Sequence, residues 1–406
     1  MYNKREKLVL GNGLQVLLDP KPLEKCGVML IVNSGNSNDV VPGTAHLLEH
    51  LQGSAVKVYG DAEELNYVGD RNATTSYDIT HYHFFDILPE HLDVALDNLL
   101  KVLSPVNIPV IDREKNAVRN ELGRRQNPHS KFNDRIVRLL SPNHSRYMYG
   151  IDESLNALDG LTQDDCFNFW NEHYNPANSV LYIGGEIPDD VSRIIKPWEK
   201  FEKKPLIPKR DIPEEPALEN RLELREKIRQ DPHAGITINY QISTFPKNAS
   251  LEESLTRNIL IAYFKSSHGP LYKELRDETG LCYSLDIGGD NLGDSGILSF
   301  GATTGFPEKI MEIEERWNKI LKDMAKTSVP SSFLETFKNG HKISMINSKS
   351  MFDVDGLIQE FKHGVDNERI RKAIEGLNSG DVASFAQSLV DKNYLVGISL
   401  PLNHQD

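Results

Sequence analysis

Apolar and polar residues alternate in several short runs within the first 90 residues of the chain. The run at 7–19 is centred on Asn12-Gly13, a dipeptide that favours the tight turn of a β-hairpin. Residues 27–35 (GVMLIVNSG) are dense enough in apolar side chains to form a mostly buried strand. Residues 73–88 alternate in the same way as the first run. The pattern therefore predicts strands in all three regions.

Helical periodicity separates and follows these predicted strands. Residues 44 to about 52 have helical character, and residues 90–104 repeat apolar side chains at helical spacing. Strands and helices that are mixed within the same 200 residues indicate an α+β domain. We expect a mainly antiparallel sheet packed with helices.

The composition of the chain changes at residues 201–221, where four prolines lie among charged residues. Such a segment is typical of an extended linker between domains. A chain of 406 residues also exceeds what one hydrophobic core usually supports. We therefore predict a first domain at 1–200 and a second domain at 222–406.

The second predicted domain repeats features of the first. Residues 160–185 align with residues 376–401, and both have the pattern of a capped helix followed by an apolar strand. Residues 27–33 have a similar counterpart at 235–241. The order of these matches predicts two similar domains in tandem.

Charge and cysteine content narrow the range of partners and compartments. Fifty-nine acidic residues against 46 basic ones leave a net charge of −13, so we expect neither nucleic acid nor an anionic membrane as a partner. Cys26, Cys166 and Cys282 are sparse and widely spaced, which favours a reducing compartment. The N-terminal residues lack the apolar region of a signal peptide, and no run approaches the roughly 18 apolar residues of a spanning helix. We predict a soluble, cytoplasmic protein.

The pentapeptide HLLEH, residues 46–50, carries the candidate chemistry. On a helix, His46 and His50 stand one turn apart on the same face and can direct two imidazoles at one metal ion. Glu49 borders that face, and its carboxylate can reach a water on the metal without ligating the metal itself. The order H-x-x-E-H is that of the inverzincins, and it has no counterpart in the second half of the chain. Taken alone, the pentapeptide fits an ordinary packed helix equally well.

A catalytic zinc requires a third protein ligand, and residues 110–125 supply two candidates. These residues predict a helix on which Glu114 and Glu121 lie about two turns apart and share one face. One carboxylate can ligate the metal while the other supports a ligand or the substrate. The alternative is a pair of ordinary exposed glutamates, and for Glu114 alone that alternative is the stronger.

A second pair of histidines lies on a predicted strand. His81 and His83 are two residues apart, so they share a face and could bind a metal. We favour the alternative that they are partly exposed residues of the sheet.

Several segments resemble the pitrilysin-type inverzincin metallopeptidases, a family that includes insulin-degrading enzyme and the mitochondrial processing peptidase. GTAHLLEHLQG, NATTSYDITHYHF and EKNAVRNEL resemble segments of its first domain. LTQDDCFNFWNEHYNPANSVLYIGG resembles the end of that domain, and GPLYKELRDETGLCYSLDI resembles the signature segment of the second. The resemblance therefore covers both halves and implies the short, two-domain form of the family.

The resemblance implies a role for each candidate residue of the first domain. His46, His50 and Glu121 would ligate one zinc ion per chain. Glu49 would be the general base, and Glu114 would be the supporting carboxylate of an E-x6-E pair.

The resemblance also implies residues that contact the substrate. Asn72 and Ala73 would lie beside the cleft and hold the substrate backbone. Arg276 and Tyr283 fit the Arg-x6-Tyr pair of the second domain, whose donors suit a substrate carbonyl and its developing oxyanion. Without the resemblance, the pattern indicates a surface arginine on a helix that ends at Gly280 and a tyrosine in the next strand.

Three features depart from the family pattern. Between His50 and Glu121 lie 121 − 50 − 1 = 70 residues, fewer than is usual, which predicts a shortened loop. Asp78 stands where a glutamate is usual, and residues 52–55 (QGSA) replace a segment that usually contains an aromatic residue of the first subsite. None of these departures removes a ligand or the base.

We therefore predict a zinc endopeptidase that hydrolyses peptides or unfolded polypeptide segments. Family members enclose their substrate in a chamber of four such domains, so a chain with two implies a homodimer, or a heterodimer with a related subunit. The competing hypothesis is a non-catalytic or partner-dependent subunit of a peptidase-like complex. Such subunits typically lose part of the H-x-x-E-H set or the Arg/Tyr pair, whereas this chain retains both.

Overall fold

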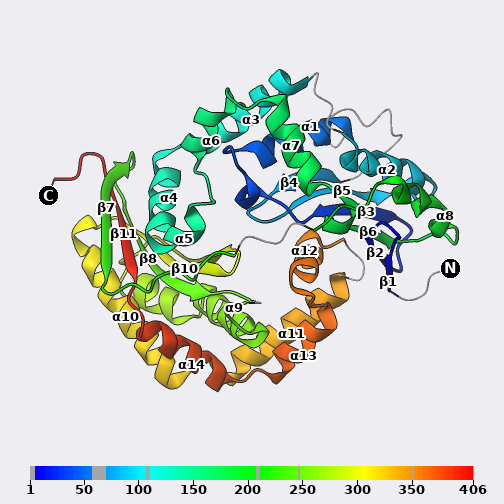
Figure 1. The fold of residues 1–406 in the computed structure, drawn as a ribbon. Coiled ribbons are helices and arrows are strands. Elements are labelled where there is room, and N and C mark those ends of the chain that lie inside the picture. Colours follow the sequence, from blue (N-terminus) through cyan, green and yellow to red (C-terminus); the bar gives the residue numbers. More distant parts are fainter. Residues whose placement is uncertain are drawn as a thin grey trace. The chain divides into compact units, whose positions relative to one another are not determined.

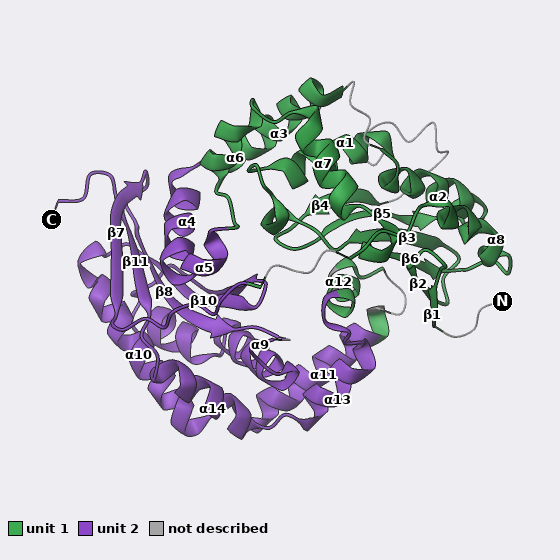
Figure 2. Ribbon diagram, viewed as in Figure 1, with its two compact units in different colours: residues 1–126, 147–211, 346–361 green, residues 127–146, 212–345, 362–406 purple. Residues whose placement is uncertain are grey.

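The computed structural model describes residues 5–56, 70–105, 110–206, 211–245, 247–348 and 352–405. Its elements form two compact units, which are described separately below (Figure 1, Figure 2). Unit 1 comprises residues 1–126, 147–211 and 346–361, and unit 2 comprises residues 127–146, 212–345 and 362–406. Each unit thus contains one segment from the other half of the sequence.

Unit 1 contains a six-stranded sheet in the order β1-β2-β6-β3-β5-β4. The pair β2–β6 is parallel and the other pairs are antiparallel. The predicted hairpin around Asn12-Gly13 is formed by β1 and β2. The strands of this sheet are β1 (Glu6–Val9), β2 (Gln15–Pro20), β3 (Cys26–Val32), β4 (Arg71–Thr75), β5 (Thr80–Ile87) and β6 (Ser179–Gly185).

The main core of unit 1 lies between one face of this sheet and a layer of helices. Alternate residues of the strands, such as Val28 and Leu30 in β3 and Tyr82 in β5, point into this core, because successive side chains of a strand face opposite ways. The helices that contribute buried residues are α1 (Thr44–Ala55), α2 (Leu92–Leu100), α3 (Ile111–Arg125), α6 (Ile151–Leu158), α7 (Gln163–His173) and α8 (Val191–Ile195).

The opposite face of the same sheet is also apolar, and residues 352–361 cover it. A second cluster of buried side chains packs there against Phe352 and against apolar residues of helix α12 (Val354–His363) as far as Phe361. Gly27 in β3 makes room for this contact, because a Cβ atom at that position would lie 2.6 Å from Phe85 and 3.1 Å from Phe352. The buried residues of this cluster are Leu17, Met29, Ile31, Phe85 and Tyr182 on the strands and Ile79 just before β5.

His81 and His83 lie on β5 and are buried, with 6% and 4% of their surface exposed. The expectation that they are partly exposed was wrong, because unit 1 covers both faces of its sheet. Their rings stack on each other and then on Phe85. Burial lowers the pKa of both imidazoles, and that of His81 falls to about 4.

Unit 2 contains a five-stranded sheet in the order β7-β11-β8-β10-β9. The pair β7–β11 is parallel and the other pairs are antiparallel. The strands are β7 (Leu222–Arg229), β8 (Ala234–Ser243), β9 (Ser284–Leu292), β10 (Ser295–Thr304) and β11 (Leu395–Pro401).

Helices cover both faces of this second sheet as well. The main core packs one face against α9 (Leu251–Lys265), the π-helical turn η8 (Tyr272–Glu278), α10 (Ile310–Thr327), α11 (Ser331–Ser348), α13 (Asn367–Gly376) and α14 (Ser379–Val390). The other face packs against α4 (Pro128–Leu140), which precedes the short α5 (Pro142–Ser145). Gly397 in β11 makes room for α4, because a Cβ atom there would lie 3.1 Å from Phe132 and 2.7 Å from Ile136.

The two sheets repeat one topology. The order β2-β6-β3-β5-β4 of unit 1 matches β7-β11-β8-β10-β9 of unit 2, including the single parallel pair. The helix before β6 and the helix before β11 both begin with a capping box, formed by Thr162 with Asp165 and by Asn378 with Asp381. The prediction of two similar α+β domains in tandem is confirmed.

The last part of the proline-rich linker, residues 211–220, is hydrogen-bonded to α5 of unit 2. Residues 211–220 form neither helix nor strand. The carboxylate of Glu215 accepts hydrogen bonds from the backbone N–H groups of Asn143 and His144, both at 2.9 Å, at the start of α5. Short 3-10 helices complete the described elements: η1 (Asn36–Asn38), η3 (Pro89–His91), η4 (Lys101–Leu103), η6 (Pro176–Asn178), η7 (Lys196–Lys200) and η9 (Pro307–Lys309).

Candidate metal centre

Helix α1 carries the H-x-x-E-H residues, and a buried aspartate fixes where this helix starts. Gly43, with φ of +85°, forms the N-cap. The Asp39 carboxylate accepts hydrogen bonds from the backbone N–H groups of Gly43 and Ala45, both at 2.8 Å. Burial raises the pKa of Asp39 to about 7, although these backbone donors oppose the shift. These bonds hold the backbone of Ala45, the residue just before His46, in place.

The side chains of His46, Glu49 and His50 lie close together on α1, as their spacing predicts. The ligand-type atoms of His46, Glu49 and His50 all lie within 4.8 Å of one another. The two imidazole rings have their centroids 5.0 Å apart and are nearly perpendicular. Glu49 is only 2% exposed, whereas the histidines are partly accessible. A buried carboxylate thus borders two accessible imidazoles.

Glu121 of α3 completes the group. Its Oε2 lies 3.3 Å from Nε2 of His46 and 3.4 Å from Nε2 of His50. Hydrogen bonds from these two histidines lower the pKa of Glu121. Burial opposes the charge on His50, but the carboxylates around it raise its pKa above the usual histidine value.

The separation of the Glu121 oxygen from each histidine nitrogen is that of two neighbouring ligands on one tetrahedral zinc ion. Zinc binds nitrogen and carboxylate oxygen at about 2.0–2.1 Å, so neighbouring ligand atoms lie about 3.3–3.4 Å apart. The oxygen of Glu121 has this separation from both imidazole nitrogens. The donor set, two histidines and one carboxylate, is also one that zinc enzymes use. The side chains therefore fit zinc.

Glu114, the other candidate on α3, lies behind the group. It is 5% exposed, and its Oε2 lies 3.6 Å from Nδ1 of His50, on the side of the ring away from Glu121. The suggestion that Glu114 is an ordinary exposed glutamate is therefore wrong. The supporting role that the resemblance implies for Glu114 stays a prediction.

Asn72 and Ala73 lie on β4, the edge strand of the first sheet. Asn72 is exposed and pairs with His83, whereas Ala73 is buried and pairs with Tyr82. Strand β4 also packs against α1. Main-chain groups on the outer side of an edge strand can bind an extended peptide.

Arg276 and Tyr283 lie in unit 2. Arg276 is exposed on η8 and lies over the Tyr272 ring, with 5.8 Å between the guanidinium carbon and the ring centroid. Tyr283 is 73% exposed, and its backbone N–H donates to the carbonyl of Thr303. Both side chains are thus accessible, as a role toward a substrate requires.

One of the departures from the family pattern, Gln52, has a structural role of its own. Gln52 is fully buried, and its Nε2 donates to the carbonyls of Val102 and Ser104. Asp78 lies in the turn between β4 and β5. The loop predicted to be shortened includes residues 57–69 and 106–109, which lie outside the described residues.

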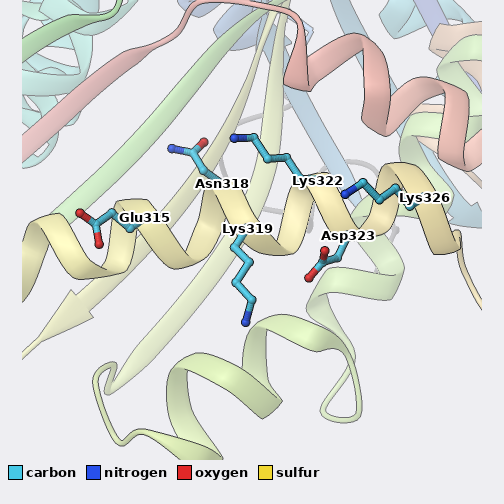
Figure 3. Close-up of a pocket in the computed structure, with 6 residues that line it drawn as sticks. All are labelled: Glu315, Asn318, Lys319, Lys322, Asp323 and Lys326. Atoms are coloured by element: carbon cyan, nitrogen blue, oxygen red, sulfur yellow. The ribbon is translucent and has the colours of Figure 1, made fainter.

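A hollow on unit 2 is a poor candidate for a site. It follows one exposed stripe of α10, where Lys319 points away from Lys322 (Figure 3). Its chemistry is that of a solvated helix face, with charges of both signs and no histidine or cysteine. The residues that line it are Glu315, Asn318, Lys319, Lys322, Asp323 and Lys326.

Comparison with known proteins agrees with this picture. Residues 15–140 match the family described as insulinase (peptidase family M16), and residues 160–340 match the peptidase M16 inactive domain. An uncharacterized zinc protease of Bacillus subtilis, YmxG, is 24% identical over 414 residues, which cover 96% of this chain and 97% of YmxG.

Solved structures share the fold across the whole chain. A protease from Helicobacter pylori superposes with a TM-score of 0.81 and 20% identity, covering 98% of this chain and 99% of its own. A peptidase M16 inactive domain from Pseudomonas fluorescens also gives a TM-score of 0.81, at 16% identity, covering 99% of this chain and 100% of its own.

Two tandem α+β units, the first with an H-x-x-E-H helix, define a pitrilysin-type architecture. The chain belongs to the pitrilysin-type M16 peptidase family. The predicted family is thereby confirmed. Within the described residues, no helix is long and apolar enough to cross a membrane.

Proposed function

We propose that this chain is a zinc endopeptidase that hydrolyses peptides or unfolded polypeptide segments. The observation that carries the proposal is the placement of one Glu121 oxygen at 3.3 and 3.4 Å from the two histidine nitrogens. In this proposal His46, His50 and Glu121 hold one zinc ion. When bound, zinc would supply Lewis acidity toward the peptide carbonyl and lower the pKa of water.

Glu49 is the proposed general base. Its carboxylate is buried at the floor of the group, with an oxygen 4.0 Å from His46 Nε2, so it borders the ligand atoms without replacing one. From there it can take a proton from the attacking water and deliver it to the leaving amine. Asn72 and Ala73, on the edge strand packed against α1, would align the substrate backbone.

Arg276 and Tyr283 are proposed to donate hydrogen bonds to the substrate carbonyl oxygen as it becomes charged. Their exposure supports this role. In the active assembly, which we propose to be a homodimer or a heterodimer with a related subunit, they would act toward a zinc site. Light scattering at the assay concentration tests the assembly, and a fully active monomer would contradict it.

The deciding experiment is metal analysis together with peptide cleavage by the purified chain. We expect about one zinc per chain and cleavage of an unstructured peptide. Glu49→Gln should retain zinc, because no ligand is lost, and should lower the cleavage rate by ~10²-fold or more. Glu172→Gln, an exposed residue of α7, is the matched control and should behave as the wild type.

His50→Ala completes the test, because it removes a proposed ligand and should lose the zinc. Full retention of zinc by this variant would refute the assignment. The cytoplasm remains the proposed compartment on the evidence of the sparse cysteines, and cell fractionation tests it.

A non-catalytic subunit is the alternative, and the similarity to a peptidase M16 inactive domain over the whole chain favours it. The proximity of His46, Glu49, His50 and Glu121 supports the enzyme instead. Zinc without peptide cleavage by the purified chain, and cleavage restored by a related subunit, would identify the partner-dependent form.

A further inference from the structure

The two carboxylate oxygens of Glu114 contact different partners. Its Oε2 faces Nδ1 of His50 at 3.6 Å. Its Oε1 points the other way and accepts a hydrogen bond of 2.8 Å from the hydroxyl of Ser54. Ser54 follows His50 by four residues, so the hydroxyl and the imidazole stand on the same face of α1, one turn apart. One helix therefore contacts both oxygens of this carboxylate.

Arg113 provides a second donor to the same oxygen. Its Nε donates to Glu114 Oε1 at 2.9 Å, and its Nη2 lies 2.8 Å from that oxygen. Nη2 also lies 3.3 Å from the Ser54 hydroxyl. Because the Arg113 side chain is 66% exposed, water competes for its bonds, and the half-buried Ser54 is the stronger support.

The orientation of Glu114 matters for His50. The Nε2 atom of this ring faces Glu121, so it must present a lone pair if it is to bind a metal. The proton then belongs on Nδ1, the atom that Glu114 Oε2 faces. If the carboxylate turned, this tautomer and the ring orientation would lose their support.

We propose that Ser54 and Arg113 are positioning residues of the metal centre, which hold Glu114 in the orientation that supports His50 as a ligand. This role presupposes the proposed zinc site. It gives a function to residue 54 in the segment QGSA, which departs from the family pattern. A hydroxyl that merely satisfied a buried carboxylate would stabilise the fold without changing metal affinity.

Zinc affinity distinguishes the two roles. The dissociation constant is measured on the full-length chain by competition with a chromophoric chelator, beside the melting temperature of each metal-free variant. Partners of this kind are worth ~10–100-fold in metal affinity. We expect Ser54→Ala to weaken zinc binding by ~10-fold and Arg113→Gln by less. Ser54→Thr, which keeps the hydroxyl, should bind zinc within about 2-fold of the wild type.

A double-mutant cycle shows whether Ser54 acts through Glu114. Added to Glu114→Gln, the Ser54→Ala change should weaken zinc binding no further. Arg119→Gln is the matched control, because Arg119 lies on the same helix and pairs with Asp159 instead. Its affinity should equal that of the wild type.

Several outcomes would overturn the proposal. A Ser54→Ala variant with wild-type zinc affinity would do so while leaving the zinc enzyme intact. Equal losses with and without Glu114 would show that Ser54 acts by another route. If Ser54→Ala does not fold, the same cycle with Arg113→Gln decides. A wild-type chain that binds no zinc would remove both this role and the proposed function.

Discussion

Two helices in equivalent places show how one architecture serves two purposes. Helix α1 lies between β3 and β4 of unit 1, and α9 lies between β8 and β9, the strands that match them in unit 2. The polar residues His46, Glu49 and His50 lie on α1, with Glu49 buried, whereas α9 (LEESLTRNILIAYFK) has no histidine and buries mainly aliphatic and aromatic residues. The topology of the sheet determines where the helix lies. A few side chains on α1 and on the neighbouring α3 determine whether that place contains a candidate metal centre.

The two units differ in chemistry but are assembled from the chain in the same way. Each sheet has an apolar face that is covered by a segment from the other half of the sequence. Each also has a glycine that admits an aromatic side chain of that segment: Gly27 admits Phe352 and Gly397 admits Phe132. Neither half of the sequence contains all that its own sheet requires.

The strongest test of this dependence is to express residues 1–211 alone. This fragment lacks 346–361 and so exposes six buried apolar side chains of unit 1. At about 1.5–3 kcal/mol each, the loss is on the order of 10 kcal/mol, comparable with the whole stability of a domain. We expect an aggregated or molten fragment by gel filtration and near-UV circular dichroism. The same fragment with 346–361 fused through a Gly/Ser linker should recover, and a cooperatively folded 1–211 would break the comparison.

Tyr283→Phe tests whether unit 2 takes part in the chemistry. If the hydroxyl donates to the oxyanion, its loss should cost ~10²–10³ in kcat, with zinc content unchanged. Tyr263→Phe removes another phenol of unit 2 whose ring packs on Phe333, and it serves as the control. Wild-type cleavage by Tyr283→Phe would show that this hydroxyl does not donate to the oxyanion, and wild-type cleavage by Arg276→Lys as well would reduce unit 2 to a structural role.

The stability of unit 1 should depend on pH through His81. Its pKa is about 4 in the folded chain and 6.5 when unfolded, so only the unfolded chain gains this proton as the pH falls from 6.5 to 4. Stability should fall over that window by about 3 kcal/mol. In urea denaturation, His81→Gln should lose correspondingly less stability between pH 6.5 and 4 than the wild type. The assignment would be refuted if the unfolding free energy of the two proteins changed equally between pH 6.5 and 4.

The smallest effects should come from the two glycines that admit the exchanged segments. Gly27→Ala and Gly397→Ala overpack tight contacts, and each should cost about 1–3 kcal/mol of unfolding free energy. Gly235→Ala, at the repeat position of Gly27, meets the ends of the Ser399 and Arg229 side chains, which can move, so it should cost less. Equal costs at Gly27 and Gly235 would show that the exchanged segment is not what requires the glycine.

Local patterns predicted the elements well, because hairpins, capped helices and buried strands depend on nearby residues. The repeat of capped helix and strand at 160–185 and 376–401 likewise identified the tandem fold. The exchange of α4 and of 346–361 could not be predicted, because an amphipathic pattern does not say which sheet a helix covers. The same gap explains the wrong expectation for His81 and His83, since the face of the sheet on which they lie, with Met29 and Ile31, is covered by a segment about 270 residues away.

Sequence patterns predicted those parts of the candidate site that depend on residues close together in the chain, and missed those that depend on the fold. The spacing of His46 and His50 on one helix was enough to bring their rings together. Glu121 required the resemblance, because spacing alone could not choose between it and Glu114. Asp39 was missed because its acceptor role depends on a loop conformation. Ser54 and Arg113 were missed because their roles depend on two helices meeting.

The position of segment 346–361 in the sequence also delays the folding of unit 1 during translation. A ribosome finishes residue 211 long before it reaches residue 361, and 361 − 211 = 150 residues separate the two. At ~5–20 residues per second this interval lasts about 8–30 s. Throughout it, the nascent first sheet has one apolar face uncovered, which is the kind of surface that chaperones bind. The chain therefore cannot complete its first half during translation until most of its second half has emerged.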